Sequence, residues 1–80
     1  MKVGDLVMLS FDWFDRQGYD DYSAYRERKA FGYGVVLSLD APDRNFPKDK
    51  WGNTYSVFFP NRGKSYKYSE HSIEVISASR

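Results

Sequence analysis

Aromatic side chains make up 19% of this sequence, which contains seven tyrosines, six phenylalanines and two tryptophans. Aromatic residues favour β-strands, because their rings pack well across a pleated, half-buried surface. The chain has 80 residues, and a chain of this size buries only about 60 to 65% of the surface that it exposes when unfolded. We therefore expect one small domain, residues 1–80, with a thin core that is rich in rings.

Five short runs of apolar and β-forming residues predict five strands. The runs are 6–9, 33–39, 54–59, 65–68 and 73–76. Side chains along a strand alternate between its two faces, so the pattern also predicts which of them point into the core. The expected core residues are Val3, Val7, Leu9, Val36, Tyr55, Val57, Phe59, Ile73 and Val75.

A long insertion, residues 11–32, separates the first two strands and shows no alternation. Within it, Asp20, Asp21 or Ser23 can cap a short helix that ends at Gly32. We therefore expect a long first loop with room for a short helix.

A second long connection spans residues 40–53, where prolines, asparagines, glycine and charged residues predict an extended loop. Gly34 inside the second strand predicts a bend or a close approach of two backbones. Gly63, three residues after Pro60, predicts a hairpin turn with a positive φ.

Four segments carry a resemblance to known small domains. They are Val3-Gly4-Asp5-x-Val7, Gly32-x-Gly34-x-Val36, Tyr55-x-Val57-x-Phe59 and Ser72-Ile73-Glu74-Val75-Ile76. The sequence resembles the Tudor, KOW and Mib types of SH3-like domain, and is similar to small uncharacterised proteins of tailed phages and marine bacteria. The resemblance implies an all-β fold, a five-stranded SH3-like barrel with binding loops at residues 11–32 and 40–53.

Chemistry typical of an enzyme is sparse in this sequence. It has no cysteine, and its single histidine, His71, lies in a polar turn. The Gly-x-Gly segment at 32–34 lacks the third glycine of a dinucleotide-binding motif. The acidic residues of the insertion lack the ligand spacing and central glycine of an EF-hand loop; they are Asp12, Asp15, Asp20 and Asp21. We therefore predict no enzymatic activity, no catalytic residue, no metal and no cofactor.

The location of the protein is predicted from the lack of targeting signals. No apolar run approaches the roughly 20 residues of a membrane helix. The first residues also lack the apolar stretch of a signal peptide. We expect a cytoplasmic protein with no membrane partner.

A ligand-binding aromatic cluster is one hypothesis. Several rings around one site can hold a cation or a methylated side chain. The candidates are Trp13, Phe14, Tyr33 and Tyr66. The alternative is that these rings belong to the core.

Nucleic-acid binding is a second hypothesis, because basic residues are concentrated in the second half. Residues 1–40 carry five basic and seven acidic side chains, whereas residues 41–80 carry seven and four. Lysine and arginine can pair with phosphates, and rings can stack on bases. The candidates are Arg44, Lys48, Lys50, Trp51, Arg62, Lys64 and Lys67. A solvated basic surface is the alternative for the same residues.

An apolar outer face is the third hypothesis. The alternation that points valines inward also places five apolar side chains outward, namely Leu6, Met8, Val35, Leu37 and Phe58. Such a patch on a soluble domain is usually covered. Either the rings of the insertion fold back over it as a lid, or a second copy or another protein covers it. We therefore predict a non-catalytic interaction module for protein binding or self-association, with nucleic-acid binding as the alternative.

Overall fold

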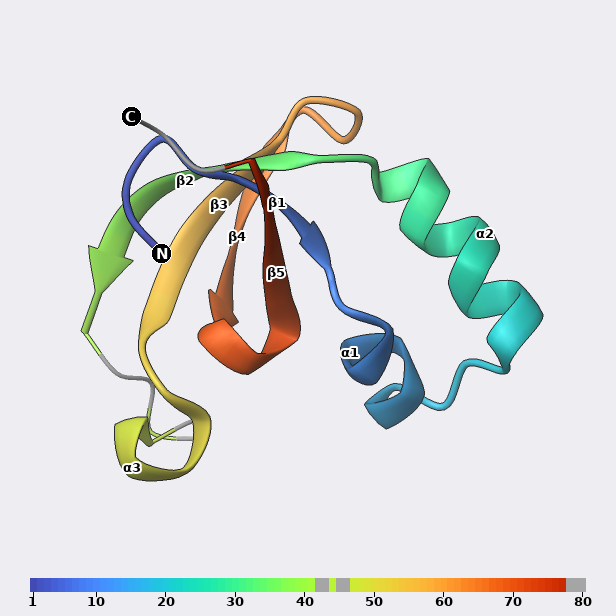
Figure 1. Ribbon diagram of the computed structural model, residues 1–80, viewed down its shortest axis with the longest axis horizontal. Coiled ribbons are helices and arrows are strands. Elements are labelled where there is room, and N and C mark those ends of the chain that lie inside the picture. Colours follow the sequence, from blue (N-terminus) through green and yellow to red (C-terminus); the bar gives the residue numbers. More distant parts are fainter. Residues whose placement is uncertain (42–43, 45–46, 78–80) are drawn as a thin grey trace.

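The computed structural model describes residues 1–41, 44 and 47–77. Within them, a five-stranded antiparallel sheet is combined with three α-helices and one 3₁₀ turn (Figure 1). In chain order the elements are β1 (Leu6–Leu9), α1 (Phe11–Arg16), α2 (Asp21–Phe31), β2 (Gly34–Asp40), α3 (Lys48–Trp51), β3 (Thr54–Phe59), β4 (Lys64–Ser69), η1 (Glu70–Ser72) and β5 (Ile73–Ser77).

The strands lie in the order β4-β3-β2-β1-β5, so β4 and β5 form the two edges of an open sheet. The expected all-β, five-stranded SH3-like barrel is therefore wrong on two counts. The sheet does not close into a barrel, and the insertion between β1 and β2 is folded as α1 and α2 rather than as a loop with one short helix. The protein has a mixed α and β fold.

Helix α1, which was not predicted, begins at a side-chain cap. The Ser10 hydroxyl accepts a hydrogen bond from the Trp13 N–H, at 3.2 Å. Asp12 in the first turn and Arg16 in the last turn form an ion pair and complement the helix dipole. Gly18 follows the helix with a φ of 88° and lets the chain turn.

Helix α2 begins and ends at two of the residues proposed for a short helix, although it is longer than expected. The Asp20 carboxylate accepts a hydrogen bond from the Ser23 N–H at 2.7 Å, and this bond is the main reason that the pKa of Asp20 is lowered. Gly32 ends the helix with a φ of 69°. In Figure 1, α1 and α2 lie on the right side of the view, and α3 lies at the lower left, at another end of the molecule.

The connection expected to be an extended loop, residues 40–53, contains the single turn of α3. Residues 42–43 and 45–46 of this connection lie outside the described residues. Gly52 follows α3 with a φ of 77° and leads the chain into β3.

The core lies on one face of the sheet and includes side chains from both longer helices. Seven of the nine expected core residues are buried, and Phe14 and Ala24 of the helices join them. The prediction was wrong for Val3 and Val75, which are 60% and 43% exposed. Val3 precedes β1, and Val75 lies on edge strand β5, which has a neighbour on one side only.

The expectation about Gly63 is confirmed, and that about Gly34 takes a different form. Gly34 is buried, and an added Cβ atom would lie 2.5 Å from the Val57 Cγ1 atom, so the close approach is to a side chain rather than to a second backbone. Gly63 has a φ of 64° in the turn between β3 and β4. No helix in the described parts of the chain is long and apolar enough to cross a membrane.

Candidate functional site

The face of the sheet directed away from the core carries a row of apolar side chains. Leu6 of β1 lies directly opposite Val35 of β2, and Val35 lies directly opposite Phe58 of β3. Directly opposite residues of antiparallel strands point to the same face, so these three side chains form one row, which we call the outer row. Met8 lies on the same face, two residues along β1. All four side chains are half-buried, and none of them belongs to the core cluster.

Leu37, the fifth residue expected on this face, lies at an irregularity in the sheet. The register between β2 and β3 shifts between Val36 and Ser38, which leaves Leu37 outside the regular ladder and 47% exposed. An extra residue in one strand moves the following side chains to the other face. Alternation counted along the sequence could not show this shift.

A polar group of side chains continues the same face beyond the outer row. Ser38 lies opposite Ser56, and Ser56 lies opposite Lys67. The Asp40 carboxylate accepts hydrogen bonds from the hydroxyls of Ser56, at 2.5 Å, and Ser38, at 2.7 Å. These two bonds, the one from Ser56 first, lower the pKa of Asp40, and the Lys67 ammonium 4.0 Å away acts in the same direction. The outer face therefore has an apolar part bordered by one carboxylate and one ammonium group.

The helical insertion does not form the expected lid over the outer row. Phe14 is fully buried in the core cluster, and Trp13 packs against that cluster from α1. Both rings thus cover the inward face of the sheet. Tyr22 and Tyr25 of α2 are 71% and 55% exposed. The insertion completes the core. The Tyr19 ring packs edge to face against Phe14, with centroids 5.4 Å apart, and Tyr22 and Tyr25 point into solvent.

The four rings proposed as a ligand-binding cluster are divided between core and surface. The Trp13 and Phe14 rings pack edge to face, with centroids 4.9 Å apart. Tyr66 packs against Phe59 at 6.2 Å and is half-buried. Tyr33 is 46% exposed just before β2. Because Phe14 has no exposed surface, these rings do not form an open cage in this conformation, and the alternative assignment to the core applies to Phe14.

The candidates for nucleic-acid binding lie in separate parts of the structure. Arg62 and Lys64 lie at the hairpin that joins β3 and β4. On α3, which precedes the start of β3, lie Lys48, Lys50 and Trp51. Arg44 and Lys67 lie elsewhere: Arg44 is exposed before α3, and Lys67 is exposed on β4. The set therefore does not form a single compact cluster.

Within the described part of the chain, two of these basic side chains have acidic partners. Arg62 lies 3.7 Å from the Glu27 carboxylate, and Lys67 lies 4.0 Å from the Asp40 carboxylate. A cation beside a carboxylate contributes less to the attraction of a phosphate than an isolated cation does.

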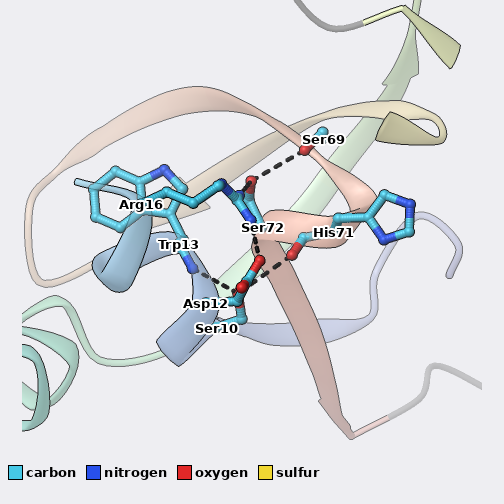
Figure 2. Close-up of polar contacts among 7 residues, drawn as sticks. All are labelled: Ser10, Asp12, Trp13, Arg16, Ser69, His71 and Ser72. Carbon is cyan, nitrogen blue, oxygen red and sulfur yellow. Dashed lines mark hydrogen bonds and ion pairs between the residues drawn. The ribbon is translucent and has the colours of Figure 1, made fainter. Parts of the chain in front are cut away.

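A group of polar contacts joins α1 to the turn before β5 (Figure 2). The Ser10 hydroxyl, which caps α1, donates a hydrogen bond to the His71 carbonyl at 3.3 Å. Figure 2 shows the His71 imidazole directed away from the other residues drawn. The histidine thus contributes its backbone here, and no second titrating side chain in the figure is placed to work with its ring.

Arg16 is the centre of this group. Its guanidinium donates hydrogen bonds to the Asp12 carboxylate and, at 2.8 Å, to the Ser72 hydroxyl. The Ser72 and Ser69 hydroxyls lie 3.0 Å apart. The guanidinium also lies 4.9 Å from the centre of the Trp51 ring. Arg16 therefore connects α1 to η1 and to α3, a structural role that the sequence indicated only through the four-residue spacing of Asp12 and Arg16.

A small cleft of about 130 Å³ lies beside Arg16. Its lining residues are Trp13, Arg16, Gln17, Thr54, Lys67, Tyr68, Ser69 and Ser72. The Thr54 hydroxyl is buried and has no hydrogen-bond partner among the described residues. Burial, followed by the nearby Tyr66, raises the pKa of Tyr68 to about 12, although Arg62 opposes this shift. Tyr68 is therefore a neutral hydroxyl at physiological pH.

Comparison with family models, with curated proteins and with solved structures finds no match for this chain. The resemblance to Tudor, KOW and Mib types of domain stays a prediction.

Proposed function

We propose that this protein is a non-catalytic interaction module that pairs with a second copy of itself through the outer row. The observation that carries the proposal is the position of Leu6, Val35 and Phe58. They lie directly opposite one another on three neighbouring strands, on the face of the sheet that the core does not use.

The position of the insertion supports an external occupant for this face. The rings of the insertion that pack against the sheet do so from the core side, so they do not shield the outer row. An apolar patch rimmed by polar groups is typical of a protein interface, because the apolar centre gains from leaving water while the rim remains solvated.

The arrangement of charge supports a second copy as the occupant. A two-fold interface brings the same surface of both protomers together, so that surface must complement itself. The outer face has Val35 at the middle of its apolar row, and the Asp40 carboxylate and the Lys67 ammonium border it on one side. Each protomer therefore presents one group of either sign, and the two can pair across a two-fold axis.

Light scattering on purified protein tests this proposal. Wild type is expected to have the mass of a dimer, and Phe58→Glu is expected to give a folded monomer, because two buried carboxylates would have to lose their hydration. The matched control is Tyr22→Glu, which places the same charge on an exposed ring of α2 and should leave the dimer intact. A monomeric wild type at every concentration would refute the proposal, as would a Phe58→Glu variant that remains a dimer.

A further inference from the structure

The outward side of α2 carries an exposed group of rings and cations that the proposed function does not use. Tyr22, Tyr25, Arg26 and Lys29 are spaced three or four residues apart, and such residues share one side of a helix. We call these four residues the tyrosine stripe. On the other side of α2, Ala24 is buried in the core cluster. The stripe therefore faces away from the core.

The two tyrosine rings of the stripe are unusually exposed for aromatic side chains. Tyr22 is 71% exposed and Tyr25 is 55% exposed. A ring that only completes a core would be buried, as Phe14 of α1 is. These two rings contribute little to the core and leave their surfaces accessible to a ligand.

Each ring of the stripe has a cation beside its face. The Arg26 guanidinium carbon lies 5.8 Å from the centre of the Tyr22 ring, and the Lys29 ammonium lies 5.5 Å from the centre of the Tyr25 ring. These contacts, each between residues four apart, hold the cations close to the rings.

The cations of the stripe differ in their surroundings from three of the arginines of this protein. Arg16, Arg28 and Arg62 each lie within 4.0 Å of a carboxylate. Among the described residues, neither Arg26 nor Lys29 has a carboxylate within that distance. The stripe therefore presents two positive charges that form no ion pair among the described residues, although Asp20 and Glu27 line the same pocket as Arg26. These two charges complement an anion.

We propose that the tyrosine stripe binds single-stranded nucleic acid. Unpaired bases would stack on the rings of Tyr22 and Tyr25, while Arg26 and Lys29 would pair with the phosphates between them. Accessible rings interleaved with cations are the combination by which proteins hold single strands without reading their sequence. An acidic peptide would satisfy the two cations but would leave the ring faces without a stacking partner. This site is separate from the outer row, so either can exist without the other.

Fluorescence anisotropy with a labelled oligothymidine tests the proposal. The unlabelled competitors are a duplex of equal length and a polyglutamate peptide. The single strand should bind most tightly. Two phosphate contacts predict that the logarithm of the binding constant falls with the logarithm of salt concentration with a slope of about −1.4, since each contact contributes about −0.7.

Matched substitutions separate stacking from charge. Tyr22→Leu keeps apolar surface but removes the flat ring, and it should weaken binding about tenfold, since stacking on one ring contributes about 1 to 3 kcal/mol. Tyr22→Phe keeps the ring and should bind like wild type. Arg26→Gln should reduce the steepness of the salt dependence by about 0.7. Lys2→Gln removes an exposed charge outside the stripe and should change neither quantity.

Three outcomes would overturn the proposal. The first is an oligothymidine that does not bind at low salt. The second is unchanged binding by the double variant Tyr22→Leu with Tyr25→Leu, provided that its circular dichroism matches that of wild type. The third is a polyglutamate peptide that competes as well as the single strand, which would assign the stripe to an acidic protein partner.

Discussion

Gly34 of β2 lies so close to Val57 of β3 that a Cβ atom at position 34 would come within 2.5 Å of the Val57 Cγ1 atom. The same Cβ atom would lie 3.0 Å from the Phe59 ring, and Val57 and Phe59 are both fully buried. A methyl group at position 34 would force these buried side chains to shift. Gly34→Ala is therefore expected to lower the free energy of unfolding by about 2 kcal/mol. Urea denaturation measures the change, and a loss below about 0.5 kcal/mol would contradict this packing.

Gly63 offers a contrast, because its requirement is conformational rather than steric. Its φ is 64°, and an added Cβ atom would meet nothing within 4 Å. Gly63→Ala is therefore expected to cost about 1 kcal/mol, which is the usual strain of an L-residue in the left-handed region. If the alanine variant proves as stable as wild type in the same urea experiment, the turn does not need this conformation.

The buried hydroxyl of Thr54 predicts a stabilising substitution. Its oxygen has no hydrogen-bond partner among the described residues, and an unsatisfied buried hydroxyl costs free energy. Thr54→Val should raise the free energy of unfolding by about 1 kcal/mol. As a comparison, Ser69→Ala should lower it, because the Ser69 and Ser72 hydroxyls are paired. Destabilisation by Thr54→Val would mean that the hydroxyl makes a bond in solution.

Acid should remove a contribution that Asp40 makes to stability. Hydrogen bonds from Ser56 and Ser38 lower the pKa of Asp40 below its ordinary value of 3.8. The folded state therefore favours the charged carboxylate, and this stability is present above pH 3.8 and lost as the pH falls through the folded-state pKa. Asp40→Asn should destabilise the protein at neutral pH and much less at low pH. The free energy of unfolding of wild type and of Asp40→Asn, measured from neutral to low pH, checks this prediction. A difference between the two proteins that does not change with pH would contradict it.

Alkali should reveal the burial of Tyr68. Burial raises its pKa from 10.0 to about 12, so the folded state favours the neutral phenol. The resulting stability is complete below pH 10 and is lost as the pH rises through about 12. Tyr68→Phe cannot ionise and should lose less stability than wild type over the same range. Parallel losses in the two proteins would show that Tyr68 ionises as readily in the folded state as in the unfolded chain.

The strands of this fold could be predicted from sequence because each one is a short run of β-forming residues between turn-forming ones. Helix α2 could be predicted in part, since Asp20 and Gly32 are clear end signals. Helix α1 could not, because Trp13 and Phe14 have modest helix propensity and are common in strands. Its cap, Ser10, was the available signal. Without the helices, a barrel was the simplest way for five strands to bury their rings.

The candidate site was predictable where strict alternation holds and not elsewhere. Leu6, Val35 and Phe58 point outward as alternation requires, whereas a register shift displaces Leu37. The tyrosine stripe was hidden for a different reason. Tyr22 and Tyr25 share one side only when the insertion is helical, so the sequence showed two rings of an expected lid rather than an exposed surface.

The most direct test of self-association is a dilution series of amide NMR spectra on wild-type protein. If two copies pair through the outer row, the concentration-dependent shifts should centre on Leu6, Val35 and Phe58 and should be absent at Tyr22 and Tyr25 of α2. Spectra that are independent of concentration in a protein that light scattering finds monomeric, or shifts that centre on α2 instead of the outer row, would contradict the account.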